Sequence, residues 1–461
     1  MVDSVLVVIV LLVIFSILQF FSGNHHHSSA VQSQLVKVEQ VPFFTYKHGC
    51  RIPSWNNVYN DKIPNATQHE KWFKDKLSRE DNLRANLSLL GAYVYPEYMA
   101  VTITSQNLFG RKVYCRYFDC KRREIQPAYE SKIFPEATAY CGRRPGAEFV
   151  SLTHELVEKP QFPIPILDRT MDQPIHNFSV CMAPIYGDDP KWLQIVEFVE
   201  HYKLQGATMF YIYVVDVDPY SRILLDDYVR TGEIELIMIH DRYEKPDWLF
   251  HMLEILDCHQ RAKYHSKWIA FVDIDERMHM TNWNKTIGDY LEKIKDEATA
   301  GIIWRTQWVQ KTENCPAKFE SREQLDKELM FLKYQNTSGV GDWGHSMKGI
   351  ARPTSLATGF IHTPGPMYKG YKTITLPPSE GVVRHYRNTE VRRFGNGGWV
   401  ENLGKKYHGY NLTRVEFVYD MVKLDCHWIA ARVWQGHHLK NPCDVEKEKR
   451  LAAMNSTTAK P

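Results

Sequence analysis

The fold class of this chain can be predicted from one segment, Ser266-Lys-Trp-Ile-Ala-Phe-Val-Asp-Ile-Asp-Glu276. Its apolar residues 268–272 predict a buried strand, which ends directly on Asp273 and Asp275. Two carboxylates with one residue between them can point to the same side of a strand's end. Carboxylate oxygens are ligands that Mg²⁺ and Mn²⁺ prefer, so we expect this pair to bind one of these ions and, with it, a diphosphate.

Strands and helices alternate on the N-terminal side of this stretch. Further strands are predicted at 179–185, 209–215 and 234–239, and helices at 190–205, 220–230 and 248–264. Repeated β-α-β units of this length require right-handed crossovers and a mostly parallel sheet. We therefore predict an α/β domain of the nucleotide-binding type. Its ligand site would lie beyond the carboxyl ends of the strands, where Asp216, Asp218, Asp273 and Asp275 fall.

A site with two aspartates needs further ligands, and the segment Gly381-Val-Val-Arg-His-Tyr-Arg387 offers a candidate. His385 could coordinate a metal through a neutral ring nitrogen, or it could be a structural histidine. Arg384 and Arg387 could meet donor phosphate oxygens, or lie on a solvated face. We predict Asp273, Asp275 and His385 as metal ligands, and Asp273, Asp275, Arg384 and Arg387 as donor-binding residues.

Such a site suits sugar transfer, because a bound dication stabilises the charge on a departing nucleoside diphosphate. Inversion at the sugar carbon also needs a carboxylate base opposite the leaving group. Asp342, in the loop Gly339-Val-Gly-Asp-Trp-Gly-His345, and Glu313 are candidates without a distinctive spacing. We name Asp342 as the candidate catalytic residue, although an aspartate there is also typical of a turn. Trp343 could stack on an acceptor ring or simply pack.

The N-terminal run Val5 to Phe21 is apolar except for Ser16 and Gln19, and it predicts a transmembrane helix. A cleaved signal peptide is the alternative, with Ser28-Ser29-Ala30 as its cleavage site. N-glycosylation sequons after the run place the remainder in the lumen. The sequons begin at Asn65, Asn86, Asn177, Asn284, Asn336, Asn411 and Asn455.

The nine cysteines fit an oxidising compartment, with several disulfides and one thiol left over. Zinc is the other interpretation, but no Cys-x-x-Cys pair of ligand spacing recurs. The totals of 57 basic and 54 acidic residues nearly balance, and nothing indicates nucleic-acid binding.

The changes in pattern along the chain predict five regions. Residues 1–21 form a cytoplasmic end and anchor, and the polar residues 22–40 form a stem. Short alternating runs and clustered cysteines predict a small β-rich accessory region over 41–175. The α/β domain covers 176–440, and residues 441–461 are a tail.

Several ordered motifs resemble glycosyltransferase family 92. They include Ala183-Pro-Ile-Tyr-Gly-Asp-Asp-Pro-Lys-Trp192, Leu225-Asp-Asp-Tyr-Val-Arg-Thr-Gly-Glu-Ile234, Ser266 to Glu276, and Val383-Arg-His-Tyr-Arg387. The resemblance covers about 179–393. It implies a GT-A fold, an inverting mechanism, and a manganese-dependent UDP-sugar donor that is usually UDP-galactose. It also implies a single-pass type II Golgi membrane protein that acts on a glycan, with core fucose of N-glycans as one acceptor.

By the same resemblance, Asp273 and Asp275 are the metal pair and His385 the late histidine that such enzymes add to it. Glu276 matches the family, whereas Arg277 stands where Phe or another apolar residue is frequent. Arg277 also argues against a haloacid dehalogenase-type phosphatase, which normally has Thr or Val two residues after its second aspartate. A lumenal glycan-binding protein without transferase activity is the other alternative.

Overall fold

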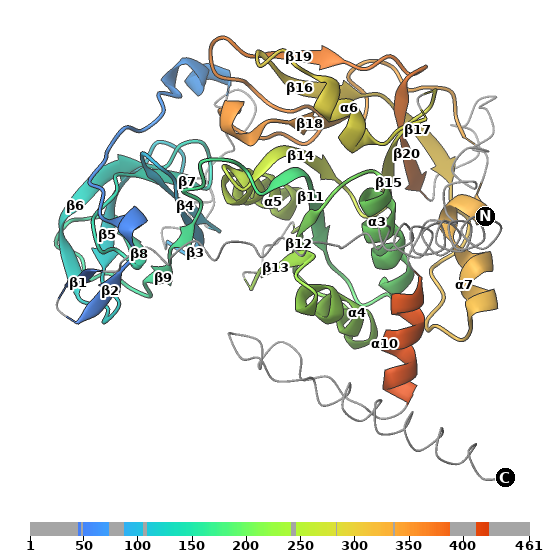
Figure 1. The fold of residues 1–461 in the computed structure, drawn as a ribbon, viewed down its shortest axis with the longest axis horizontal. Coiled ribbons are helices and arrows are strands. Elements are labelled where there is room, and N and C mark those ends of the chain that lie inside the picture. Colours follow the sequence, from blue (N-terminus) through green and yellow to red (C-terminus); the bar gives the residue numbers. More distant parts are fainter. Residues whose placement is uncertain are drawn as a thin grey trace, which may run out of the picture. The chain divides into compact units, whose positions relative to one another are not determined.

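The computed structural model describes residues 45–47, 49–72, 87–104, 108–240, 246–282, 284–334, 337–387 and 412–423 (Figure 1). The predicted anchor, stem and tail lie outside these residues. Among the described residues, no helix has the length and apolar character needed to cross a membrane. The chain divides into two compact units, residues 1–57 and 58–461. In the first, β1 (Thr45–Lys47) pairs with β2 (Cys50–Ile52), and the 3₁₀ helix η1 (Ser54–Asn56) follows.

A seven-stranded sheet forms the centre of the second unit, in the order β13-β12-β11-β14-β18-β16-β19. Only β18 runs against the other strands of this sheet, which agrees with the predicted mostly parallel arrangement. The chain moves outward from β11 to β13 and then returns to place β14 on the other side of β11. The strands are β11 (His176–Ile185), β12 (Met209–Val214), β13 (Ile234–Met238), β14 (Ser266–Val272), β16 (Thr299–Trp304), β18 (Lys348–Ala351) and β19 (Lys372–Thr375).

The helices that connect these strands follow from the sequence pattern. In α3, buried apolar residues recur at helical spacing and pack into the main core. In α4, the Asp218 side chain caps the N-terminus by accepting the Ser221 N–H at 2.9 Å, and Pro219 follows it. Asp218 is thus a helix cap. The described helices of this region are α3 (Trp192–Leu204), α4 (Pro219–Arg230), α5 (Pro246–Ala262), α6 (Ile287–Lys293), α7 (Arg322–Glu328), α8 (Met330–Lys333), α10 (Thr413–Lys423) and the 3₁₀ helix η3 (Pro353–Ser355).

A second, three-stranded sheet adjoins the carboxyl end of β14. Here β20 (Gly381–Arg387) lies between β15 (Glu276–Met280), to which it is antiparallel, and β17 (Thr306–Gln310), to which it is parallel. The chain enters β15 directly from Asp273 and Asp275, so the predicted site lies where the two sheets meet (Figure 1).

The preceding region is β-rich, as predicted. After the 3₁₀ helix η2 (Thr67–His69), it contains two four-stranded sheets, in the orders β10-β3-β4-β7 and β6-β5-β8-β9. A disulfide between Cys115 and Cys141 joins β5 to β7. The strands are β3 (Leu89–Val94), β4 (Met99–Ile103), β5 (Lys112–Phe118), β6 (Glu124–Lys132), β7 (Thr138–Cys141), β8 (Phe149–Thr153), β9 (Ile164–Pro165) and β10 (Leu167–Asp168).

The buried carboxylate of Asp257, on α5, joins the β-rich region to the α/β domain. It accepts hydrogen bonds from the Tyr93 hydroxyl at 2.7 Å and the Tyr213 hydroxyl at 2.6 Å. The Thr102 hydroxyl and Arg261 Nε also donate to it. Tyr93 and Thr102 belong to the β-rich sheet, whereas Tyr213 belongs to β12. Because buried charges need such partners, this carboxylate stabilises the contact between the two regions.

Candidate metal and donor site

A tight turn carries the two predicted aspartates out of β14. The Glu276 N–H donates to the Asp273 carbonyl at 3.0 Å, and the Asp273 N–H donates to Glu276 Oε2 at 2.9 Å. These two bonds close the turn from both sides. Asp273 and Asp275 are therefore held on a rigid backbone at the end of a buried strand.

Strand pairing brings His385 to this turn from more than a hundred residues away in the chain. Glu276 of β15 lies opposite His385 of β20, and the Tyr386 N–H donates to the Asp275 carbonyl at 2.8 Å. His385 Nε2 lies 3.4 Å from Asp275 Oδ2. One potential ligand atom from each of Asp273, Asp275 and His385 lies within 4.8 Å of the others. The three predicted metal ligands thus converge.

Two cationic or basic side chains that the sequence analysis did not identify also reach the site. Lys348, at the start of β18, is only 1% exposed, and its Nζ lies 3.2 Å from Asp273 Oδ2 and 3.1 Å from Glu276 Oε2. His251 Nε2, from α5, lies 3.3 Å from Asp273 Oδ1. Lys348 belongs to no recognisable sequence motif. Its position in the site depends on the antiparallel pairing of β18 with β14, which only the structure shows.

Burial and charge act against each other in this cluster. Burial raises the pKa of Asp273, but Lys348, His251 and His385 together outweigh it and hold the pKa of that carboxyl below its usual range. Burial lowers the pKa of His385, yet the carboxylates of Glu276 and Asp275 raise it to about 9. Burial lowers the pKa of His251 to about 4. His385 therefore carries a proton at neutral pH, which a metal ion would displace on binding.

The cluster opens into a cavity of about 620 Å³. The cavity lies beyond the carboxyl ends of β11 and β14, where the strand order reverses. This is the place where ligands bind in open α/β sheets. Its lining residues are Ala183, Pro184, Ile185, Tyr186, Gly187, Asp189, Lys191, Gln194, Phe250, His251, Asp273, Ile274, Asp275, His385 and Arg387.

The two predicted arginines lie on opposite faces of β20. Arg387 lines the cavity together with His385. Arg384 is buried on the other face, where it donates to Gln307 Oε1 and, at 3.3 Å, to His279 Nε2. Side chains alternate along a strand, so residues 385 and 387 share a face that residue 384 cannot reach.

The two candidate bases are not among the residues that line the cavity. Asp342 is exposed in a loop, where its carbonyl accepts the His345 N–H at 3.1 Å. Glu313 is exposed and pairs with Lys333 at 2.6 Å. Trp343 is exposed in the same loop as Asp342. Within the described lining, the carboxylates are those of Asp189, Asp273 and Asp275.

The chemistry of the cluster fits a hard divalent cation. Two carboxylates and an imidazole are ligands that Mn²⁺ and Mg²⁺ accept, and the cavity leaves room for ligands from a diphosphate. Within the described part of the chain, Asp273 Oδ1 and His385 Nδ1 are buried without a hydrogen-bond partner. Each has a charged or basic neighbour: Asp273 Oδ1 lies 3.3 Å from His251 Nε2, and His385 Nδ1 lies 3.4 Å from Glu276 Oε1. Buried polar atoms normally form hydrogen bonds, so Asp273 Oδ1, which lies on a cavity-lining residue, could take a bound ion as its partner.

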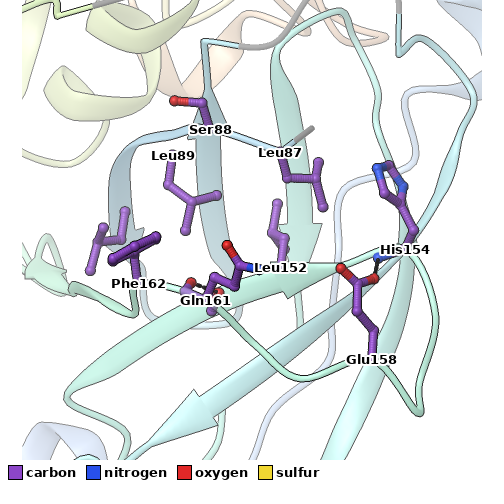
Figure 2. Close-up of a pocket in the computed structure, with 10 residues that line it drawn as sticks. Leu87, Ser88, Leu89, Leu152, His154, Glu158, Gln161 and Phe162 are labelled. Carbon is purple, nitrogen blue, oxygen red and sulfur yellow. Dashed lines mark hydrogen bonds between the residues drawn. The ribbon is translucent and has the colours of Figure 1, made fainter. Parts of the chain in front are cut away.

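A second cavity, of about 570 Å³, lies in the β-rich region. Figure 2 shows Phe162 on one side of it, Leu89 and Leu152 near its middle, and His154 and Glu158 on the other side. Glu158 Oε2 accepts the His154 N–H at 2.9 Å. None of the predicted site residues lines this cavity.

Comparison with known proteins identifies the family. The family model for "Glycosyltransferase family 92" matches residues 176–425, more than half of the chain. The chain belongs to glycosyltransferase family 92. The resemblance found in the sequence motifs is thereby confirmed, and membership shows that the chain is a glycosyltransferase at the level of the family.

A curated relative of this family 92 protein is the "Beta-1,4-galactosyltransferase galt-1" of Caenorhabditis elegans, which is 25% identical over 263 residues. The match covers 54% of this chain and 57% of the relative, so the chain spans less than two thirds of the relative's length.

Solved structures with detectable similarity include a mannosyltransferase from Pyrobaculum calidifontis in complex with GDP-Man and Mn²⁺. It is 9% identical, with coverage of 60% of this chain and 81% of that one, and a TM-score of 0.25. Another is the glucosyl-3-phosphoglycerate synthase of Mycobacterium tuberculosis with Mg²⁺ and UDP. It is 11% identical, with coverage of 52% and 80%, and a TM-score of 0.23.

Proposed function

We propose that this family 92 protein is an inverting, metal-dependent glycosyltransferase of GT-A type that transfers galactose from UDP-galactose to a glycan of a glycoprotein. The convergence of Asp273, Asp275 and His385 in one cavity carries the metal and donor part of the proposal. The galactosyltransferase name of the Caenorhabditis elegans relative supports galactose as the sugar. Core fucose of an N-glycan is the acceptor that the sequence motifs favour.

In this proposal, Asp273, Asp275 and His385 would hold Mn²⁺ or Mg²⁺, and the bound ion would supply positive charge for the departing diphosphate. Arg387 lines the same cavity and contributes a further positive charge for the phosphate oxygens. Lys348 keeps Asp273 ionised and fixed in place, because its ammonium bridges Asp273 and Glu276. These groups are in place before the donor arrives, which lowers the cost of reorganisation during transfer.

The catalytic base must approach the sugar carbon from the side opposite the diphosphate. Asp342 remains our candidate for this role, although it would have to act from the loop beside β17. The Gly341 N–H bonds to the Thr306 carbonyl at 2.8 Å, so the loop is tied to β17, which pairs with the strand that carries His385.

We also propose that the protein is a single-pass type II Golgi membrane protein with a lumenal catalytic domain. The apolar run from Val5 to Phe21 and the sequons that follow it support this topology. The disulfides Cys115–Cys141 and Cys181–Cys258 fit an oxidising compartment.

The proposal is tested by incorporation of labelled galactose from UDP-galactose into fucosylated N-glycans, with Mn²⁺ or with a chelator. We expect Asp275→Ala to lower the rate by about a hundredfold or more, because it removes a metal ligand from the reacting centre. Asp326→Ala is the matched control, since Asp326 lies on α7 in an exposed ion pair with Arg322. Undiminished activity of Asp275→Ala would refute the site. Failure of the wild type with every UDP-sugar would refute transfer itself.

A further inference from the structure

The guanidinium of Arg277 lies behind the turn that carries the proposed metal ligands. Arg277 is the second residue of β15 and is only 1% exposed. Its neighbour Glu276 points into the site, so the side chain of Arg277 leaves the strand on the other face, towards α3. There it packs over the ring of Phe198, with its central carbon 5.4 Å from the ring centroid.

The role of Arg277 is indicated by the hydrogen-bond donors to the backbone carbonyls of the turn. The carbonyl of Asp273 accepts the Glu276 N–H at 3.0 Å, and that of Asp275 accepts the Tyr386 N–H at 2.8 Å. Both donors belong to the backbone. The carbonyl of Ile274, between the two aspartates, instead accepts Arg277 Nη1 at 2.7 Å. The same nitrogen donates to the Glu276 carbonyl at 2.9 Å.

Arg277 also approaches helix α3, which packs against the turn. Its Nη2 lies 3.5 Å from the carbonyl of Gln194, in the first turn of α3, and Gln194 lines the cavity that holds Asp273 and Asp275. One buried side chain therefore bonds to the turn and approaches a helix that also contributes to the cavity lining.

We infer that Arg277 is a positioning residue that sets the geometry of Asp273 and Asp275 for metal binding, through the Ile274 carbonyl. The inference rests on the proposed function. The Ile274 carbonyl belongs to the peptide unit that joins Ile274 to Asp275. If this unit loses its donor it can rotate, which changes the backbone torsions on either side of it and so the direction of the Asp275 carboxylate relative to that of Asp273. Metal sites tolerate only small departures from their ligand geometry, so a change behind the turn alters affinity although Arg277 touches no ligand.

The substitution Arg277→Met tests this, because methionine keeps much of the apolar bulk and removes the donors. Removal of the cation also changes the surroundings of Glu197, which is fully buried on α3 and feels the charge of Arg277. The double variant Glu197→Gln, Arg277→Met replaces both ionisable groups with neutral ones and keeps a side-chain oxygen for the Met330 N–H that Glu197 now accepts. It separates a folding defect from a positioning defect.

The measurement is direct Mn²⁺ binding, followed by the loss of the free-ion electron paramagnetic resonance signal, with thermal unfolding recorded on the same samples. We expect the Kd for Mn²⁺ to rise about tenfold or more in both variants. In the double variant this rise should persist with a thermal midpoint close to that of the wild type. Arg277→Lys, which keeps a charge and a donor, should recover part of the affinity.

Arg352→Met is the matched control. Arg352 is also buried and lies over an aromatic ring, that of Trp268, but it pairs with Glu297 at the other end of β14. Its Kd for Mn²⁺ should not change. Wild-type affinity in the double variant would overturn the inference and leave the proposed function intact. A wild-type protein that binds no Mn²⁺ would overturn the metal site and, with it, the inference.

Discussion

Removal of Lys348 should destabilise the metal-free protein, and a bound cation should restore much of the loss. The Lys348 ammonium lies 3.2 Å from Asp273 and 3.1 Å from Glu276 and is almost fully buried. At an effective dielectric constant of about 20, one such contact is worth about 5 kcal/mol of attraction before desolvation is subtracted. Loss of one partner of a buried pair typically costs about 3–5 kcal/mol, because the other charge remains buried. We expect Lys348→Met to lose this amount.

The assay is urea unfolding of the full chain, followed by tryptophan fluorescence, in a chelator and then in Mn²⁺. A cation at a hundred times its Kd stabilises the folded state by about 2.7 kcal/mol. Without the lysine, the carboxylates of Asp273 and Glu276 should attract the ion more strongly, so Mn²⁺ should stabilise Lys348→Met more than the wild type and the deficit seen in chelator should shrink. When Asp273 is already replaced by asparagine, Lys348→Met should lower the free energy of unfolding by at least about 1 kcal/mol less than it does in the wild type. This difference measures the direct coupling between Lys348 and Asp273.

Two results would refute this reasoning. A loss below about 1 kcal/mol in chelator would show that Lys348 does not balance the buried carboxylates. An identical loss in chelator and in Mn²⁺, with the ion shown to bind, would show that lysine and metal do not act on the same charges.

Three further outcomes follow from charged side chains of this protein. Burial raises the pKa of Glu197 from 4.5 to about 8, so the folded state holds a proton there that the unfolded chain releases above pH 4.5. The stability of the wild type relative to Glu197→Gln should therefore fall as pH rises from 4.5 to 8, by at most about 5 kcal/mol, in urea titrations at several pH values. Asp257→Asn should lower the free energy of unfolding by about 2–4 kcal/mol, since an amide cannot accept every bond that the carboxylate accepts; an unchanged thermal midpoint would contradict this. Arg387→Met should raise KM for the UDP-sugar about tenfold, whereas Arg384→Met should leave KM unchanged. Steady-state kinetics measures both KM values, and a raised KM in Arg384→Met alone would contradict this expectation.

The local elements were predictable because their signals are local. The predicted helix at 190–205 is α3 at Trp192–Leu204, and the predicted strand before Asp273 is β14. Apolar periodicity over ten to twenty residues is enough to set such elements. The resemblance of the motifs to family 92 added the prediction that Asp273 and Asp275 bind a metal.

Long-range pairing explains what the sequence did not reveal. His385 was found as a motif residue, but its place opposite Glu276 depends on the register of β15 against β20. Lys348 lies on β18, which pairs antiparallel with β14. An antiparallel strand is not part of a β-α-β series, so the alternating pattern of strands and helices did not predict where Lys348 lies. The position of Arg384 was predictable in principle, because alternation along a strand excludes it from the face that His385 occupies.

The contacts of helix α5 limit where the chain can be truncated for expression. Near its N-terminal end Phe250 and His251 line the cavity, and further along Asp257 is bonded to two side chains of the β-rich region. A fragment that begins at residue 176, where the family match starts, would leave Asp257 without the hydroxyl groups of Tyr93 and Thr102. The segment that the family model matches is thus too short to provide every partner of the Asp257 carboxylate, and expression trials should keep β3 and β4 as well.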